Sequence, residues 1–359
     1  MTLYLLALWG GIAACCSFLL TKFMIRINIQ DVPNNRSSHI KVTPKSGGIA
    51  VAVPFLGALF LYNTFFSFSL PFITPILIAS MIIVIMGVWD DMKGLSWRVR
   101  LGFQGSVALF VVGSGLYFKT LFLPYFGVVP LGIWGGVLSG LGIVAFMNFY
   151  NFMDGLNGIT IGSTLIALFF YGIMVLGLNF ENQSSLTFFC IFFLILTLLP
   201  IFFFNFPDGK IFLGDAGSQF LGLILFLIGV LGTSEFPEIF QNNGQEIAGI
   251  SPFLIPLLFF NFIFDGLLTL ILRALRGRKI WEADRNHLFH MLLDKKISAE
   301  KVSYIHFIFF TIQGIVAFYF TFYVSLRFFI LGLGLILSLH IFYAYWLLQK
   351  PQLKRGSHA

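Results

Sequence analysis

The stretch that decides the fold lies near the middle of the chain. Residues 148–160 read NFYNFMDGLNGIT, preceded by GLGIVAFM and followed by IGSTLIALFFYGIMVLGL. Both flanking runs have the unbroken hydrophobicity of helices buried in hydrocarbon, whereas the quoted stretch holds polar side chains and glycines. The polar positions are Asn148, Asn151, Asp154 and Asn157. This pattern predicts that one membrane helix ends here and another begins.

The composition of the whole chain supports a membrane protein. Of 359 residues, 58% are hydrophobic and 10% are charged, and the mean hydropathy is +0.92. A soluble domain carries about 25% charged residues, so a large soluble core is excluded. No Lys or Arg precedes residue 22, whereas a signal peptide places its positive charge first, so we expect the first apolar run to be a membrane helix. The three cysteines lie in apolar runs without metal-ligand spacing.

Apolar runs of about 20 residues predict an all-α polytopic bundle of eleven spans, which form one domain over 1–359. The predicted spans are 3–25, 48–67, 72–89, 102–118, 129–149, 159–178, 186–204, 217–234, 251–273, 303–325 and 327–348.

The basic residues predict the orientation of these spans. With the N-terminus outside and the C-terminus in the cytoplasm, all Lys and Arg residues except Lys119 and Arg327 fall on the cytoplasmic side. The net charge of +7 therefore reflects membrane topology, and we expect no nucleic-acid partner. The predicted cytoplasmic loops are 26–47, 90–101, 150–158, 205–216 and 274–302.

Carboxylates collect at the cytoplasmic ends of the predicted spans. Acidic groups at membrane depth are costly and usually functional, so a shared site is favoured over simple headgroup contacts. The five are Asp90, Asp91, Asp154, Asp215 and Asp265. Carboxylates and Asn carbonyls suit Mg²⁺, which normally keeps waters and bridges substrate phosphates. Asp90 and Asp91 are adjacent, so on a helix they point about 100° apart and should have different roles.

Residues 214–218, GDAGS, open the eighth predicted span. Asp215 is placed like an N-cap, and the free N–H groups from Ala216 onward are a natural seat for a phosphate. Basic side chains of the cytoplasmic loops are candidates to bind phosphate oxygens. They are Lys45, Arg98, Arg100, Lys210 and Arg285, joined by His287 and His290. Magnesium, a phosphate seat and cations together indicate phosphoryl-type transfer between a membrane lipid phosphate and a soluble nucleotide.

At these residues the chain resembles the polyprenyl-phosphate N-acetylhexosamine-1-phosphate transferases, a family that includes the phospho-N-acetylmuramoyl-pentapeptide translocases. The matching pieces occur in the family's order over residues 36–290. They are RSSHIKVTPKSGGIAV, DDMKGLSWRVRLGFQ, NFYNFMDGLNG, FLGDAGSQFLG, DGLLTLILRALRG and ADRNHLFHML. The resemblance implies transfer of a sugar-1-phosphate from a UDP-sugar to undecaprenyl phosphate, with release of UMP, in the bacterial inner membrane.

The resemblance also assigns roles to residues of this chain. Asn151 and Asp215 match the magnesium positions, with Mn²⁺ as an alternative cofactor. Asp90 matches the position that orients or deprotonates the lipid phosphate, with Asp91 beside it. Asn157 and Phe212 match residues at the uridine end, and His287 and His290 match the histidine motif near the diphosphate. Asp154 is not one of these matches; we expect it beside the metal as a further catalytic candidate.

For some positions the sequence allows two roles. Ser37 and His39 contact lipid phosphate or cap their loop, and Asp265 forms a structural ion pair or contributes to the site. His306 and His340, away from every motif, are expected to be packed or hydrogen-bonded residues.

The RSSH…TPKSGG form is similar to the subgroup that initiates O-antigen, the surface glycan of lipopolysaccharide, so an N-acetylated hexosamine or a 6-deoxy relative is expected as the sugar. Two alternatives remain: the phospho-N-acetylmuramoyl-pentapeptide transferase of peptidoglycan synthesis, and a transporter or lipid flippase. A transporter should place its polar residues near the bilayer midplane in two related halves, and the sequence shows neither. A homodimer is among the assemblies that the sequence leaves open.

Overall fold

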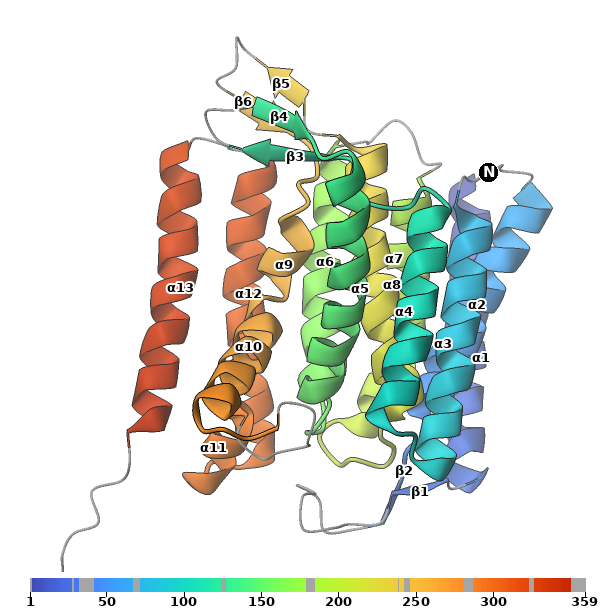
Figure 1. Cartoon of the computed structure of the whole chain (residues 1–359). Coiled ribbons are helices and arrows are strands. Elements are labelled where there is room, and N and C mark those ends of the chain that lie inside the picture. Colours follow the sequence, from blue (N-terminus) through green and yellow to red (C-terminus); the bar gives the residue numbers. More distant parts are fainter. Residues whose placement is uncertain are drawn as a thin grey trace, which may run out of the picture.

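The computed structural model is a bundle of long helices that run side by side between two ends of the molecule (Figure 1). The residues that the structure describes are 2–27, 29–31, 42–66, 72–123, 127–178, 185–237, 239–241, 246–279, 287–322 and 326–349. Within these ranges, three short antiparallel strand pairs accompany the helices and no larger sheet forms. The prediction of an all-helical, polytopic membrane protein is confirmed.

The helices follow the apolar runs because a backbone in hydrocarbon must satisfy its own hydrogen bonds. Their bounds are α1 (Thr2–Ile27), α2 (Gly47–Phe66), α3 (Ile73–Lys93), α4 (Trp97–Gly113), α5 (Ile133–Met153), α6 (Ile159–Leu178), α7 (Leu186–Asn205), α8 (Gly214–Glu235), α9 (Leu254–Leu258), α10 (Phe260–Leu275), α11 (Leu288–Asp294), α12 (Ala299–Phe322) and α13 (Leu326–Leu348). The strands pair as β1 (Gln30–Asp31) with β2 (Thr43–Pro44), β3 (Thr120–Leu123) with β4 (Gly127–Pro130), and β5 (Ile239–Gln241) with β6 (Glu246–Ala248).

Nine of the described helices are long and apolar enough to cross a membrane, and each corresponds to a predicted span. The other two predicted spans differ from the structure in length or continuity. The span predicted at 102–118 corresponds to α4, which has 17 residues and begins at Trp97 because the Ser96 side chain caps it. The span predicted at 251–273 is divided into α9 and α10.

The start of α5 was also predicted too early. Residues 129 and 130 belong to β4, which pairs with β3, so α5 begins four residues after the predicted start at 129. Pro130 has no N–H to donate within a helix, and Gly132 takes a positive φ of 54°. These two residues separate the hairpin from the helix.

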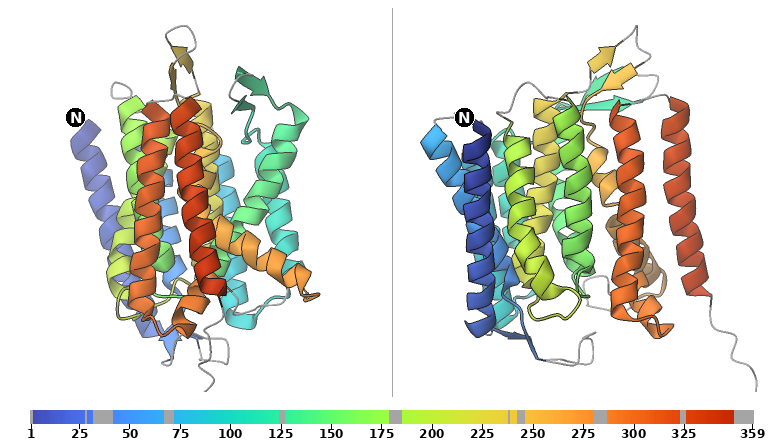
Figure 2. Two further views of the ribbon diagram at one scale, coloured as in Figure 1. Left: turned by 90° about the vertical axis from the view of Figure 1, so that its left-hand side faces the viewer. Right: turned by 180° about the vertical axis from the view of Figure 1, so that it is seen from behind.

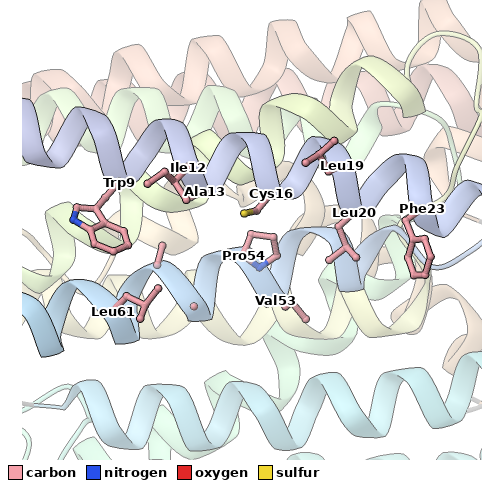
Figure 3. Close-up of a pocket in the computed structure, with 12 residues that line it drawn as sticks. Trp9, Ile12, Ala13, Cys16, Leu19, Leu20, Phe23, Val53, Pro54 and Leu61 are labelled. Carbon is pink, nitrogen blue, oxygen red and sulfur yellow. The ribbon is translucent and has the colours of Figure 1, made fainter.

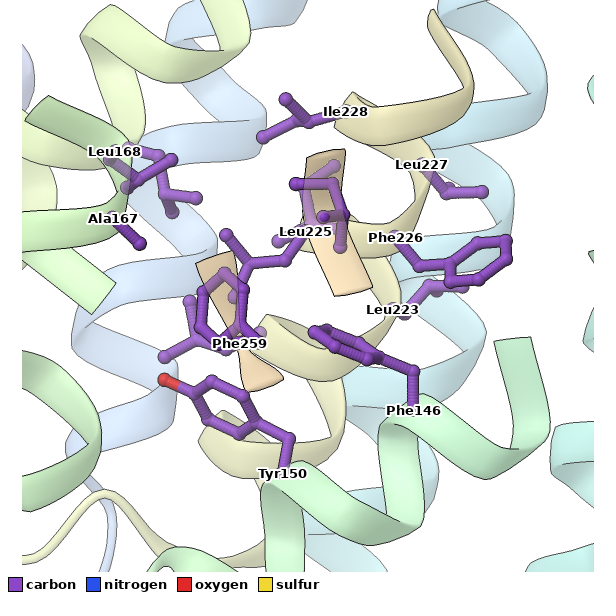
Figure 4. Packing of buried hydrophobic residues seen from close by; sticks show 14 of the residues in the cluster. Phe146, Tyr150, Ala167, Leu168, Leu223, Leu225, Phe226, Leu227, Ile228 and Phe259 are labelled. Carbon is purple, nitrogen blue, oxygen red and sulfur yellow. The ribbon is translucent and has the colours of Figure 1, made fainter. Parts of the chain in front are cut away.

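The central helix of the bundle is α8, which is buried over nearly all of its length. It packs against α2, α3, α5 and α7. Figure 4 shows its apolar side chains facing α5, where the Phe226 ring lies 6.2 Å from that of Phe146. The Phe146 ring in turn lies 5.3 Å from that of Phe259. A helix apolar on all sides is expected at such a central position.

Glycines allow α8 to approach its neighbours closely at the end that carries its N-terminus. A Cβ atom on Gly48 of α2 would lie 2.1 Å from the Gly217 nitrogen. A Cβ atom on Gly87 of α3 would lie 2.3 Å from the Ala216 Cα atom. Because the backbones are in contact at both places, the first turn of α8 is held between α2 and α3.

The break between α9 and α10 falls at Phe259 and is stabilised from α12. The side-chain amide of Gln313, oriented to satisfy both groups, lies 2.9 Å from the Leu258 carbonyl oxygen and 3.0 Å from the Asn261 nitrogen. The Asn261 side chain also forms a 2.7 Å hydrogen bond with His306 Nδ1. His306 is thus a hydrogen-bonded structural residue, as expected. After the break, α10 leans away from the bundle (Figure 2).

An apolar groove of about 490 Å³ lies between α1 and α2. Figure 3 shows Trp9, Cys16 and Phe23 of α1 on one side and Pro54 and Leu61 of α2 on the other. Its lining contains no charged side chain. This groove is suited to hydrocarbon chains and is separate from the polar residues described below.

The glycine contact between α2 and α8 makes a testable prediction. Gly48→Ala should lower the free energy of unfolding by about 1–3 kcal/mol, because the new methyl group must push the two backbones apart. Gly57→Ala on the same helix is the matched control, since its Cβ would meet nothing within 4 Å. Denaturant unfolding of the purified protein in detergent measures both. Equal stability of the two variants would contradict this packing.

Candidate active site

The polar segments predicted to be cytoplasmic gather at one end of the bundle, opposite the hairpins β3–β4 and β5–β6 (Figure 1). This end carries the C-termini of α3 and α5 and the N-terminus of α8. Asp215 lies at its centre, within electrostatic reach of Asp90, Asp91 and Asp154. The structure therefore brings four of the predicted carboxylates together.

Asp91 is buried and caps the N-terminus of α8. Its Oδ1 atom accepts a 3.0 Å hydrogen bond from the Asp215 backbone nitrogen, and its Oδ2 atom accepts one of 3.1 Å from the Ala216 nitrogen. The expectation that Asp215 is the N-cap is wrong, because α8 begins at Gly214 and Leu213 precedes it. Of the N–H groups expected to seat a phosphate, that of Ala216 is already bound by the Asp91 carboxylate.

Asp90 points elsewhere, as the 100° separation predicted. Its Oδ1 atom accepts a 2.6 Å hydrogen bond from the Leu95 nitrogen, which fixes the turn between α3 and α4. Its Oδ2 atom lies 3.3 Å from an Arg100 guanidinium nitrogen. Asp90 is 5% exposed while the Arg100 side chain is 34% exposed. The Arg100 guanidinium is thus partly exposed to solvent, while the Asp90 carboxylate that pairs with it is buried.

Asn151 and Asp215 are in direct contact. Asn151 Nδ2 donates a 2.6 Å hydrogen bond to Asp215 Oδ1 and a 2.8 Å hydrogen bond to Ser218 Oγ. The last turn of α5 is thereby joined to the first turn of α8. Ser218 was not singled out from the sequence, although it lies one helical turn after Asp215 in the GDAGS motif.

Asp154 ends α5 and lies beside this pair. Its Oδ1 atom accepts a 2.6 Å hydrogen bond from Thr160 Oγ1 at the start of α6. Burial raises the pKa of the Asp154 carboxyl to about 7; the Thr160 hydrogen bond lowers it and the charge of Asp215 raises it. A carboxyl group with this pKa can hold or release a proton near neutral pH.

Asn148 belongs to a relay of amides rather than to the carboxylate cluster. Its Nδ2 atom donates to Gln104 Oε1 at 2.8 Å, and Gln104 Nε2 donates to Gln219 Oε1 at 2.7 Å. Gln104 and Gln219 are each 1% exposed. The relay connects α4, α5 and α8, and sequence reasoning missed its two glutamines because single amides in apolar runs resemble ordinary packing residues.

The loop after α5 is fastened to the loop after α7. Asn157 Nδ2 donates to the Pro207 carbonyl oxygen at 3.2 Å. The backbone carbonyl oxygen of Asn157 accepts a hydrogen bond from Ser303 Oγ of α12 at 2.7 Å. Buried Asn205 accepts from the Gly158 nitrogen at 2.6 Å and donates to the Ile211 carbonyl oxygen at 2.8 Å. Asn205 was not predicted from the sequence, where it follows a run of phenylalanines.

The two histidines lie near this loop and are buried. His287 Nδ1 lies 2.9 Å from Asp265 Oδ1, so Asp265 bonds the histidine segment directly. The His287 ring lies 5.7 Å from that of Phe152 on α5, and the Phe289 and His290 rings are 4.1 Å apart. The histidine motif is therefore placed against the same end of α5 as Asn151.

The remaining predicted residues are placed less centrally or lie outside the described residues. Lys45 is within electrostatic reach of Asp90 and Asp91. The Phe212 backbone pairs with residues 44 and 47. Two basic side chains are directed elsewhere: Arg98 is exposed and stacks on Trp97, and Lys210 pairs with exposed Asp208. Ser37, His39 and Arg285 lie outside the described residues.

The donor set at this end fits one hard divalent cation only if water completes its coordination. In the part of the chain that the structure describes, no group of three or more His, Cys, Asp or Glu side chains is arranged around a metal. The two Asp91 oxygens bind backbone N–H groups, whereas Asp215, the adjacent Asn151 amide and Asp154 are candidates to offer oxygen donors. Mg²⁺ is commonly held by one or two protein ligands together with waters and phosphate oxygens.

Comparisons with known proteins identify sequence relatives of this chain. Residues 73–233 match the family described as Glycosyl transferase family 4, a range that covers α3 to most of α8. A Bacillus subtilis (strain 168) protein named probable undecaprenyl-phosphate N-acetylglucosaminyl 1-phosphate transferase is 29% identical over 277 residues, which cover 77% of this chain and 72% of the relative. A Mycobacterium leprae decaprenyl-phosphate N-acetylglucosaminephosphotransferase is 28% identical over 330 residues, which cover 87% and 82%. A Yersinia pestis undecaprenyl-phosphate alpha-N-acetylglucosaminyl 1-phosphate transferase is 27% identical over 287 residues, which cover 77% and 72%.

The cap on α8 gives a prediction about stability. Asp91→Asn should lower the free energy of unfolding by about 1–3 kcal/mol, because an amide offers one acceptor oxygen and no charge to the two N–H groups. Denaturant unfolding of the purified variant measures the loss. Asp208→Asn is the control, since that carboxylate is 66% exposed and should not change stability. An Asp91→Asn protein as stable as the control would refute the cap.

Proposed function

Because residues 73–233 match glycosyl transferase family 4, we propose that the chain transfers a sugar-1-phosphate from a UDP-sugar to undecaprenyl phosphate and releases UMP. The observation that carries this proposal is the contact of Asn151 with Asp215 at the end of a membrane bundle, beside the Asp90–Arg100 pair. A lipid phosphate can reach such a place from the bilayer and a nucleotide can reach it from water. The names of the relatives describe transfer of N-acetylglucosamine-1-phosphate to polyprenyl phosphates.

In the proposed reaction an oxygen of the lipid phosphate attacks the sugar-proximal phosphorus of the donor. The bond between that phosphorus and the oxygen bridging to UMP breaks, and UMP leaves with the electron pair. A charged phosphate is already a nucleophile, so the protein has to position it rather than activate it. Arg100, paired with Asp90, would bind the lipid phosphate. Direct attack of this kind needs no covalent aspartyl intermediate.

Asp215 and Asn151 would hold Mg²⁺, which when bound supplies positive charge to the diphosphate oxygens. The half-buried Asp154, within electrostatic reach of Asp215, would lie beside this metal. Asn157, whose amide binds the neighbouring loop, and Phe212 would contact the uridine. Lys45, within reach of Asp90 and Asp91, adds positive charge for phosphate oxygens.

The finer biological role follows from the same proposal. The donor would be UDP-N-acetylglucosamine or a related N-acetylated or 6-deoxy sugar, since the curated relatives are named for N-acetylglucosamine. The product would start a lipid-linked surface glycan of the O-antigen type at the cytoplasmic face of the inner membrane. The transmembrane helices supply the contact with the bilayer that a polyprenyl substrate requires.

This function predicts magnesium-dependent UMP release. Purified protein mixed with undecaprenyl phosphate and UDP-N-acetylglucosamine should release UMP, lose activity on chelation with EDTA and regain it with Mg²⁺. Asp215→Asn should lower kcat about 100-fold or more, because a charge that acts on the diphosphate is removed. Asp208→Asn, exposed in the neighbouring loop, should retain wild-type turnover. An Asp215→Asn enzyme with wild-type kcat would remove Asp215 from the metal site.

The donor sugar can be identified with the same assay run across a panel of UDP-sugars. We expect N-acetylated hexosamines to support UMP release, and UDP-glucose, which lacks the acetamido group, to give a kcat/KM at least about tenfold lower because the site then loses hydrogen bonds to that group. Release of UMP from UDP-N-acetylmuramoyl-pentapeptide alone would favour the peptidoglycan alternative.

A further inference from the structure

Asp265 is a buried carboxylate of α10 with four hydrogen bonds and no role in the proposed reaction so far. It is 1% exposed. Its Oδ1 atom accepts from His287 Nδ1 at 2.9 Å and from Thr269 Oγ1 at 3.2 Å. The Leu288 backbone nitrogen lies 3.1 Å from Oδ1 and 3.0 Å from Oδ2. The carboxylate therefore joins α10 to the start of the histidine segment.

The histidine segment is packed against the candidate site. The His287 ring lies 5.7 Å from that of Phe152, the residue that follows Asn151. A Cβ atom on Gly155 would lie 2.8 Å from the Phe289 ring, so this ring lies over the turn that follows Asp154. The Asp265 contact thus fixes the place of His287 relative to the end of α5.

The same contact fixes which ring nitrogen of His287 carries hydrogen. Two acceptors face Nδ1: the Asp265 carboxylate at 2.9 Å and the Thr269 hydroxyl oxygen at 3.3 Å. The Thr269 hydroxyl hydrogen is directed to Asp265 Oδ1, so its oxygen lone pair is available to the ring. Nδ1 must therefore carry the proton, and Nε2 is the nitrogen left to meet substrate.

We propose that Asp265, with Thr269, is a positioning residue for the transfer reaction: it orients His287 and fixes its tautomer so that Nε2 is presented to the donor diphosphate. This inference rests on the proposed function. A simpler role as a cap for α11 accounts for the contacts to the Leu288 nitrogen. That capping role does not explain why the Asp265 carboxylate and the Thr269 hydroxyl both contact Nδ1 of His287. Asp265 and Thr269 are each 1% exposed.

The test uses the full chain in lipid nanodiscs with undecaprenyl phosphate and UDP-N-acetylglucosamine. Asp265→Asn keeps the size and one acceptor oxygen, and Thr269→Val removes only the hydroxyl. Glu235→Gln is the matched control, because Glu235 also receives backbone N–H groups, those of Leu186 and Thr187 on α7. We expect Asp265→Asn to lower kcat about tenfold or more, Thr269→Val to lower it less, and Glu235→Gln to stay within about twofold of wild type.

A second readout separates positioning from stability. With ring-¹⁵N-histidine, NMR should show Nδ1 of His287 protonated in the wild type and a loss of that preference in Asp265→Asn, with the signal assigned by its absence in His287→Gln. In the His287→Gln background, Asp265→Asn should cost at most about twofold more, because it acts through the missing ring.

Two results would overturn the inference: Asp265→Asn with the kcat of the control, or a wild-type His287 ring without hydrogen on Nδ1. Failure of the proposed function gives a different result. The wild type would then release no UMP from any UDP-sugar, whereas the NMR signal would still show whether Nδ1 of His287 is protonated.

Discussion

The contact on which the site depends is that of the Asp91 carboxylate with two N–H groups in the first turn of α8, those of Asp215 and Ala216. An unpaired helix N-terminus surrounded by protein would be costly, because its N–H groups have no partner within the helix. By satisfying them from α3, Asp91 places Asp215 in the first turn of α8 at a fixed distance from the end of α3. The same turn is held from both sides by the close contacts at Gly48 and Gly87, which the absence of a Cβ atom allows.

The same device recurs where other segments meet. Glu235, at the far end of α8, receives the N–H groups of Leu186 and Thr187 at the start of α7, and Asp265 receives that of Leu288 at the start of α11. In each case a carboxylate of one element binds the free N–H groups of another, which is favourable because a helix N-terminus carries partial positive charge. Short loops are thereby held in place without a soluble domain around them.

Much of the fold could be predicted from the sequence, because an apolar run long enough to cross a bilayer has few alternatives to a helix. The break at Phe259 was not predictable, since Gln313, whose amide stabilises it, lies in a distant apolar run. Motifs and spacing indicated all four carboxylates that the structure gathers around Asp215. Which of them caps α8 depends on how α3 meets α8, and local sequence carries no information on that. Gln104 and Asn205 were missed for a related reason, as each is a single amide whose partners are remote in the chain.

The amide relay has a consequence for how deep α4 sits. With 17 residues, α4 is shorter than its neighbours, and its surroundings in hydrocarbon would allow it to slide along its axis. Gln104 is bonded on one side to Gln219 and on the other to Asn148, so a displacement of one turn would break both bonds. Arg100 lies one turn from Gln104 on the same helix. The axial register of α4, and with it the depth at which a cation faces Asp90, is therefore determined by an uncharged side chain in the second turn of α8.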